Sequence, residues 1–231
     1  MLDVQKISFR WGRRPLLDDV SFSVEPGELV VLAGPNGAGK TTLLSVLAGL
    51  ILPTSGTVLA DGLDTFEHPL RFRRVMGYLP ESAPVDPALT VQDYLTYRAF
   101  LKGERSRKVP HRVREALSLC GLQPFARHRT DTLSQGLRKR TALAEALLLR
   151  PRFLFLDDLL AGLDLTTRAA MGRILATVAT FAAVVVSGHE LEEFGAYATR
   201  FLVLRGAKLT SVKTAAEARA LLAPPSDGGE A

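Results

Sequence analysis

The chain has 231 residues, of which 47% are hydrophobic and 23% charged, and this balance suits one globular domain with a substantial core. Its formal net charge of +5 permits contact with anionic lipid, nucleic acid or nucleotide but selects none of them. An intrachain disulfide is excluded, because Cys120 is the only cysteine. No transmembrane helix is expected, because no run of about 20 uncharged apolar residues occurs, and no secretory signal is expected, because the N-terminus lacks a long apolar run.

The first third of the chain has the pattern of strands followed by a glycine-rich loop and a helix. Apolar and polar residues alternate in 4–9 and 20–24, which predicts two strands of a half-solvated antiparallel sheet. Residues 28–33 form a short apolar run of the kind that a buried parallel strand needs. After the glycine-rich loop, a helix is expected over about 41–50, and 54–62 is expected to hold a hairpin strand between two turns.

Helical periodicity dominates from about residue 80 to residue 149, and we expect an inserted helical subdomain there. Two amphipathic helices are predicted over 89–101 and 111–122, with a polar connector over 102–108. The same region carries a basic cluster: Arg98, Lys102, Arg105, Arg107, Lys108, Arg112 and Arg114. A solvated helical face is its simplest interpretation and anionic lipid headgroups are the next. Nucleic acid is disfavoured because only Phe100 interleaves an aromatic ring with these charges.

Strands and helices alternate again in the last third. Apolar runs predict buried strands over 152–158 and 181–189, with a helix over about 166–180 between them, and one further strand over 200–210. This alternation predicts an α/β fold with a mostly parallel sheet.

The domain organisation is predicted to be simple. Residues 1–223 are expected to form a single domain. The tail 224–231 (PPSDGGEA) has nothing to pack and is expected to be disordered.

One motif carries specific chemistry. Residues 34–41 match G-x-x-x-x-G-K-[ST] at every fixed position, between a predicted strand and a predicted helix. The glycines let successive backbone N–H groups point at phosphate oxygens, and the helix that follows adds the positive end of its dipole. We expect Lys40 to reach the β- and γ-phosphates of a nucleotide and the Thr41 hydroxyl to bind Mg²⁺. A glycine turn with a chance Lys-Thr pair is the alternative.

Further motifs give the chain a family resemblance. GPNGAGKTTLL, LSQGLRKR, FLFLDD, AGLD and SGH occur in this order and together resemble the motifs of ABC ATPases across residues 2–210. The resemblance implies a P-loop NTPase core of the ABC type, with a mostly parallel sheet, an N-terminal antiparallel β-subdomain and the inserted helical subdomain. It also implies ATP and Mg²⁺ as ligands.

The resemblance assigns the nucleotide-binding residues. Ser134 and Gly136 lie in a sequence similar to the family signature, which contacts ATP that is held by a partner subunit; a simple helix cap is the alternative. Trp11 lies where the family places an aromatic ring that stacks on adenine; a core tryptophan is the alternative. The remaining residues belong to the phosphate loop: Gly34, Pro35, Asn36, Gly37, Ala38, Gly39, Lys40, Thr41 and Thr42.

Two neighbouring aspartates follow the apolar run that ends at Leu156. Asp157 suits a Mg²⁺ shell at the mouth of the sheet, or else it caps the next segment. Asp158 stands where the family has a catalytic glutamate and is one methylene shorter. Because a misplacement of about 1 Å can lower a rate on the order of 100-fold, slow turnover is expected. Leu159 and Leu160 replace the family's usual Pro-Thr or Pro-Ser.

Three more segments are assigned by the resemblance. His189 lies at the place of the switch histidine that touches the γ-phosphate, although a lone histidine is more often structural. Glu81 occupies the place of a glutamine that links Mg²⁺ and the attacking water to the membrane subunits. A glutamate can ligate Mg²⁺ but adds a negative charge, so we treat Glu81 as both a catalytic and a metal candidate. Residues 161–164 resemble the loop that crosses the dimer interface.

The resemblance favours one function and leaves two alternatives. The chain is expected to be the ATPase subunit of an ABC transporter, cytoplasmic and peripheral on the inner face of the cell membrane, that pairs head to tail with a second cassette and docks on separate membrane subunits. The short C-terminus and the sequence GYLPE resemble exporters of the ABC-2 kind. A catalytically weak partner of a competent cassette is the first alternative. A protein that acts on ribosomes or DNA is the second alternative. The favoured function has no nucleic acid among its expected partners.

Overall fold

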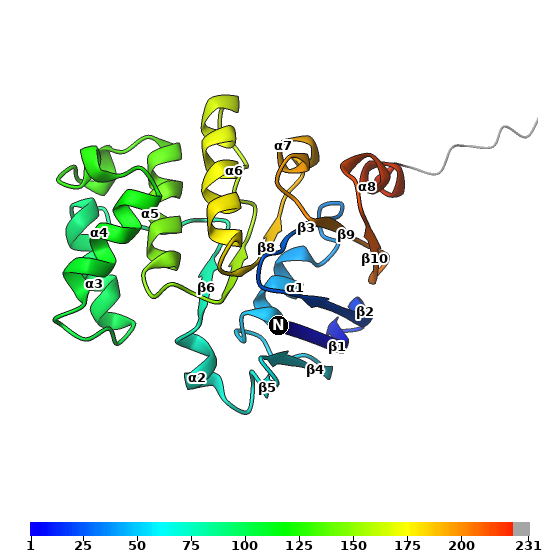
Figure 1. Cartoon of the computed structure of the whole chain (residues 1–231). Coiled ribbons are helices and arrows are strands. Elements are labelled where there is room, and N and C mark those ends of the chain that lie inside the picture. Colours follow the sequence, from blue (N-terminus) through cyan, green and yellow to red (C-terminus); the bar gives the residue numbers. More distant parts are fainter. Residues whose placement is uncertain (224–231) are drawn as a thin grey trace, which may run out of the picture.

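A six-stranded sheet forms the centre of the molecule in the computed structural model, which describes residues 1–223 (Figure 1). The expectation of a disordered tail over 224–231 lies outside these residues. In spatial order the strands are β10 (Lys208–Val212), β9 (Arg200–Arg205), β3 (Leu29–Ala33), β8 (Ala183–Ser187), β7 (Phe153–Leu156) and β6 (Met76–Leu79). Every neighbouring pair except β10 and β9 is parallel, which confirms the predicted α/β class.

The central strands are buried on both faces. Val31 of β3 belongs to one apolar cluster, whereas Val30 and Leu32 belong to the other. The same alternation places Leu154 and Phe155 of β7 in different clusters. Successive side chains of a strand point to opposite faces, so an uninterrupted apolar run is what such a strand requires.

The second sheet is antiparallel and contains the N-terminal strands. Its order is β2 (Arg14–Val24), β1 (Leu2–Trp11), β4 (Ser55–Ala60) and β5 (Leu63–Asp64). Residues of this sheet share an apolar cluster with helix α1 (Lys40–Leu47) and with one face of the central sheet. The predicted antiparallel β-subdomain and the predicted hairpin near 54–62 are therefore both present.

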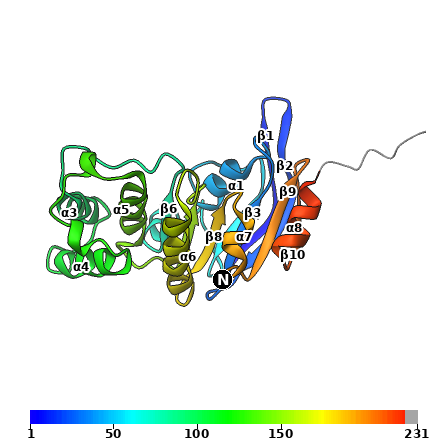
Figure 2. The same ribbon diagram turned by 90° about the horizontal axis from the view of Figure 1, so that it is seen from above.

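Helices cover the opposite face of the central sheet and extend to one end of the molecule. Figure 2 shows the extension, which contains α3 (Val91–Leu101), α4 (Val109–Leu119) and α5 (Gln135–Leu147). Short 3-10 turns at Gln123–Phe125 and Thr130–Thr132 connect α4 to α5. This group matches the predicted helical region, although the bounds of a separate subdomain remain a prediction.

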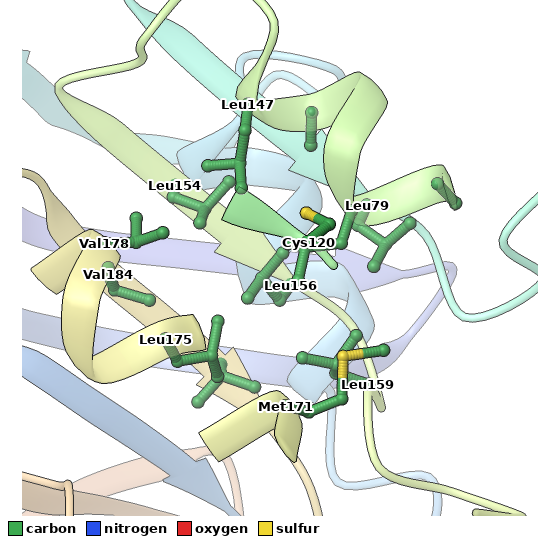
Figure 3. Close-up of a cluster of buried hydrophobic side chains, with 14 of the residues drawn as sticks. Leu79, Cys120, Leu147, Leu154, Leu156, Leu159, Met171, Leu175, Val178 and Val184 are labelled. Carbon is green, nitrogen blue, oxygen red and sulfur yellow. The ribbon is translucent and has the colours of Figure 1, made fainter. Parts of the chain in front are cut away.

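One apolar cluster joins the helical extension to the sheet. Figure 3 shows Leu156 of β7 near Cys120, which follows α4, and near Leu79 of β6. Leu175 of helix α6 (Leu165–Ala179) and Leu147 of α5 belong to the same cluster. Burial raises the pKa of the Cys120 thiol to about 12, so this cysteine is a packing residue rather than a reactive one.

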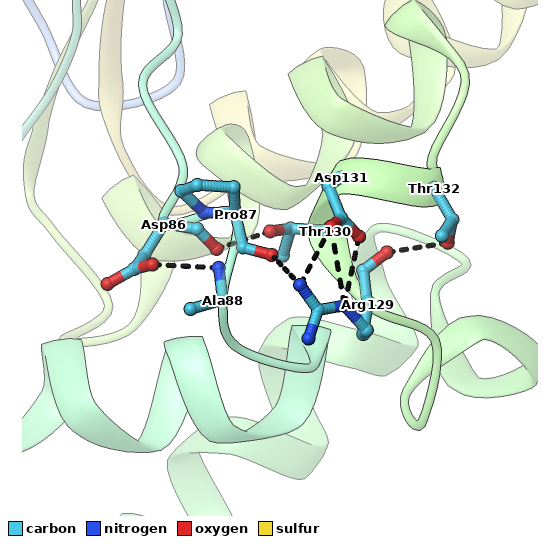
Figure 4. Close-up of polar contacts among 7 residues, drawn as sticks. All are labelled: Asp86, Pro87, Ala88, Arg129, Thr130, Asp131 and Thr132. Atoms are coloured by element: carbon cyan, nitrogen blue, oxygen red, sulfur yellow. Dashed lines mark hydrogen bonds and ion pairs between the residues drawn. The ribbon is translucent and has the colours of Figure 1, made fainter.

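A polar network also fastens the helical extension. Arg129 Nη2 donates to the carbonyl oxygen of Pro87 at 3.2 Å, and the Thr130 hydroxyl donates to the carbonyl oxygen of Asp86 (Figure 4). The Thr130 N–H donates to Leu89 O at 3.0 Å. These bonds hold the segment after Glu81 against the segment that leads into α5.

One predicted strand is in fact a hairpin. The expected single strand over 200–210 is divided into β9 and β10, which pair antiparallel with Arg205 opposite Lys208. Gly206 and Ala207 both have positive φ angles, 57° and 65°, as a two-residue hairpin turn requires. Alanine rarely adopts this conformation, so the Gly-Ala pair is a weak turn signal in the sequence.

The basic cluster is not the uniform solvated face that was expected. Arg98 and Lys102 both pair with Glu145 of α5, at 3.1 and 2.9 Å, and Arg112 pairs with Glu104 at 2.9 Å. Packing α3 on α5 brings Glu145 to the cluster from a distant part of the sequence. Elements that the sequence did not predict include β5, β6, α2 (Pro69–Arg73), α7 (Leu191–Gly195) and α8 (Ala215–Leu222).

Candidate functional site

The phosphate-loop motif forms a turn between β3 and α1, as predicted. Gly39 is the N-cap of α1 and has a φ angle of 104°, a conformation that glycine adopts without a Cβ penalty. No side chain of residues 1–223 caps this helix, so the N–H groups of its first turn are not occupied by a cap. A Cβ at Gly34 would lie 2.6 Å from Leu204 O, which explains why the first glycine is needed. The loop therefore presents free N–H donors to an anion.

Lys40 turns back over this loop. Its Nζ donates to the carbonyl oxygens of Gly34 at 2.8 Å and Pro35 at 3.2 Å, and lies 3.4 Å from His189 Nε2. Burial lowers the pKa of the Lys40 ammonium, and the carboxylates of Asp158, Asp157 and Glu81 oppose this shift. The loop thus places one cation within reach of a bound phosphate.

A cavity of about 280 Å³ lies beside the loop, at the carboxyl ends of β3, β6, β7 and β8. The strands end at the same level, because Leu32 of β3 pairs with Ser187 and Leu79 of β6 pairs with Leu156. Its lining includes most of the predicted site residues: Asn36, Gly37, Ala38, Gly39, Lys40, Thr41, Thr42, Glu81, Asp157, Asp158 and His189. Ligand sites in open α/β sheets typically occupy this edge.

The two aspartates are tied together by Ser187 of β8. The buried Ser187 hydroxyl donates to Asp157 Oδ1 at 2.6 Å and accepts the backbone N–H of Asp158 at 2.9 Å. Asp157 is only 3% exposed. This network holds the Asp157 carboxylate and the backbone N–H of Asp158 in place.

Asp158 occupies an unusual conformation. Its φ angle is 47°, in the left-handed region that aspartate tolerates better than most residues. Its Oδ1 is buried and has no hydrogen-bond partner among residues 1–223. Burial raises the pKa of the Asp158 carboxyl, and the neighbouring Glu190 raises it further. A carboxylate with a free oxygen in a partly buried site can accept a proton or orient a water molecule.

His189 and Glu81 both line the cavity and both are exposed. His189 is exposed just after β8, and its backbone N–H donates to Glu190 Oε2 at 3.2 Å. Glu190 is held by Arg168 of α6 at 3.3 Å. Glu81 is exposed after β6 and also lines an adjoining groove of about 460 Å³ that extends to Gln135 of α5.

Five predicted residues lie outside the cavity lining, and two of them, Gly34 and Pro35, belong to the phosphate loop itself. Ser134 and Gly136 are at the exposed start of α5, where the Ser134 hydroxyl accepts the N–H of Leu137 at 3.3 Å and so caps the helix. Trp11 is 73% exposed at the end of β1, which excludes the alternative of a core tryptophan. Arg14, across the hairpin from Trp11, donates to Gly37 O at 3.5 Å, so the hairpin reaches the phosphate loop.

Two polar residues near the site were missed by the sequence analysis. Ser187 stands directly before Gly188 and His189, and the sequence predicts for it only a place in the buried strand over 181–189. Lys139 lies in α5, where its Nζ contacts the loop after Asp158. Burial lowers the pKa of Lys139, and the Asp158 carboxylate opposes the shift. Lys139 lies one turn before the buried Leu143 on the same face of the helix, and this spacing is a signal in the sequence that could have identified it.

Comparison with known proteins identifies a family. The family model described as ABC transporter matches residues 17–161, more than half of the chain. The uncharacterized ABC transporter ATP-binding protein YxlF of Bacillus subtilis (strain 168) is 33% identical over 210 residues, which cover 91% of this chain and 70% of YxlF.

Two further comparisons cover very different shares of the proteins that they match. The probable multidrug ABC transporter ATP-binding protein YbhF of Escherichia coli (strain K12) is 34% identical over 91% of this chain, but the match spans only 37% of YbhF. A solved dimeric structure of MJ0796, described as a bacterial ABC transporter cassette, superposes with a TM-score of 0.82 and covers 92% of this chain and 98% of its own. At 24% identity this likeness shows the fold.

We predict that Ser187→Ala lowers the free energy of unfolding by about 1–3 kcal/mol, because it leaves a buried carboxylate oxygen and a backbone N–H without their partner. Chemical denaturation of both proteins measures the difference. Ser118→Ala on the exposed face of α4 is the control, with an expected change within about 0.5 kcal/mol. Equal effects of the two substitutions would show that the Ser187 network does not stabilise the site.

Proposed function

This chain belongs to the ABC transporter family, and from that membership we propose that it hydrolyses ATP between two head-to-tail cassettes and so drives separate membrane subunits. One observation carries the proposal: the phosphate loop, Asp157, Asp158 and His189 line one cavity, whereas the signature-like Ser134 is exposed elsewhere. Each chain then supplies half of an ATP site, and a second cassette completes it.

The phosphate loop is proposed to bind the nucleotide triphosphate. Uncapped N–H groups of α1 and the Lys40 ammonium provide donors for phosphate oxygens. Trp11, exposed on the hairpin that reaches Gly37, is available to stack on the adenine.

The residues also fit a magnesium ion. No cluster of three or more His, Cys, Asp or Glu side chains suited to a metal occurs in the described part of the chain. Mg²⁺ needs no such cluster, because it commonly takes one or two carboxylates together with substrate phosphates. Thr41, Asp157 and Glu81 line the same cavity and would be its protein ligands. When bound, the ion would neutralise developing charge on the phosphates.

Asp158 is proposed as the catalytic carboxylate. Its unpaired Oδ1 can accept a hydrogen bond from the attacking water, and His189, beside Lys40, can contact the γ-phosphate. The aspartate has a shorter reach than the family's glutamate, so slow turnover is expected. The alternative, a weak partner of a competent cassette, rests on the same substitution, and the turnover experiment below separates the two.

A groove of about 1010 Å³ is proposed to receive the membrane subunits. It lies between α2, β6 and α3, and Pro80 in its lining immediately precedes Glu81. Leu70 and Leu101 in the lining are 74% and 59% exposed. Large apolar side chains that are exposed together in one groove mark a site of contact with another protein. A segment docked there would sit next to the Glu81 loop.

The cellular setting follows from this docking. No helix within residues 1–223 is long and apolar enough to cross a bilayer. Attachment to a membrane through the docked partner subunits, on the cytoplasmic side, is part of the proposal. An exporter of the ABC-2 kind remains a prediction from the GYLPE sequence.

Lys40→Ala is expected to weaken MgATP binding at least about 10-fold, since a hydrogen bond from a charged group contributes about 1.5–3 kcal/mol. Isothermal titration measures the affinity, and Lys108→Ala at an exposed position is the control. Unchanged affinity in the Lys40 variant would refute the assignment of the phosphate loop.

ATP is expected to drive association of two cassettes, and Ser134→Arg is expected to prevent it by placing a bulky side chain at the exposed start of α5. Sedimentation with and without ATP detects the dimer, and Ser118→Arg on α4 serves as the control. If the Ser134 variant associates as readily as wild type, Ser134 is only a helix cap.

Asp158→Asn keeps the side-chain shape and tolerates the positive φ, but it removes the charge, so we expect phosphate release to fall at least about 100-fold. Asp158→Glu adds one methylene and is expected to raise the rate. Steady-state phosphate release tests both variants. Equal rates for wild type and the Asn variant would favour the weak-partner alternative, and a slower Glu variant would show that the site is built around aspartate.

A further inference from the structure

Lys139 is a charged residue in an apolar setting. It lies in α5, little more than one turn after Ser134, and is only 7% exposed. Lysine is rarely buried to this extent unless its ammonium has partners that replace water. The partners in this case all belong to a single loop.

The Lys139 ammonium contacts the backbone directly after β7. Its Nζ donates to the carbonyl oxygens of Asp158 at 2.9 Å, Leu159 at 3.1 Å and Ala161 at 2.8 Å. An ammonium has three N–H donors, so each can be directed to a different carbonyl. The Asp158 carbonyl also accepts the N–H of Ala161 at 3.3 Å, which closes the turn. One side chain therefore holds both ends of the turn that begins with Asp158.

Other contacts join the start of α5 to the same loop. A Cβ at Gly162 would lie 2.7 Å from Gln135 Nε2, and a Cβ at Gly136 would lie 3.0 Å from Thr167 Cγ2 of α6. These close approaches leave little space between α5 and residues 158–167. A displacement of α5 would therefore displace this loop as well, because no gap between them is wide enough to accommodate the movement.

We propose that Lys139 is a positioning residue that couples α5 to the Asp158 carboxylate. The inference rests on the proposed function, in which Ser134 at the start of α5 meets the nucleotide of the partner cassette while Asp158 acts on the nucleotide of its own chain. Closure on the partner's ATP shifts α5, and the Lys139 ammonium carries that shift to the Asp158–Ala161 turn. Each ATP site thereby aligns the carboxylate of the other.

The first test compares turnover with binding. Lys139→Met keeps a long unbranched side chain but loses all three donors, and Lys139→Gln keeps two. We expect kcat for phosphate release to fall about 10- to 100-fold in the Met variant and less in the Gln variant, since a displacement of about 1 Å is enough for this loss. ATP affinity by titration and KM should stay within about twofold. Lys108→Met, at an exposed position, controls for the change in charge.

The second test does not depend on activity. Hydrogen exchange of backbone amides in 158–163 should accelerate in the Met variant, while exchange in 40–47 of α1 should not change. A non-hydrolysable ATP analogue that closes the dimer should slow exchange in 158–163 of the wild type but not of the Met variant.

The outcomes separate this inference from the proposed function. Wild-type kcat in the Met variant, unchanged exchange in 158–163, or an equal acceleration in both segments would overturn the role of Lys139. A wild-type chain that does not bind ATP would instead overturn the proposed function, and the exchange in the absence of nucleotide would still decide whether Lys139 holds the Asp158 turn.

Discussion

Burial of the parallel strands on both faces is the constraint that organises the molecule. Because β3, β7 and β8 are covered by one apolar cluster on each side, a polar side chain within them would lose its water without compensation. Polar residues are therefore confined to the strand ends. The pairing of Leu32 with Ser187 ends two of these strands at one level, so the loops that follow meet around a single cavity.

Both lysines near that cavity are held by backbone carbonyls. Lys40 donates to Gly34 O and Pro35 O, and Lys139 donates to three carbonyls of the turn that begins at Asp158. Neutral carbonyl dipoles can thus replace water around an ammonium without neutralising a carboxylate. Within residues 1–223, Asp158 Oδ1 has no hydrogen-bond partner, so this carboxylate oxygen stays available for chemistry. The turn and the helix α5 then form one connected unit.

The sequence predicted the local features well because they depend on local physics. The glycine spacing from Gly34 to Lys40 requires a phosphate-loop turn, and apolar runs require buried strands. It failed at the turn of Gly206 and Ala207, where strand pairing holds an alanine in a left-handed conformation that its propensity disfavours. Helices as short as α2 and α7 were also missed, because five residues carry too little periodicity to be recognised.

The sequence by itself determined the fold class, the phosphate loop and the order of the strand-end residues, since these follow from residue type and spacing. Only the tertiary structure decided which polar groups meet. Ser187 joins Asp157 across 30 positions, and Lys139 reaches the Asp158 carbonyl across 19. It also decided that Trp11 is exposed rather than buried. Such contacts depend on how strands and helices pack in three dimensions, and no local pattern of residues encodes the distance between segments that are far apart in the chain.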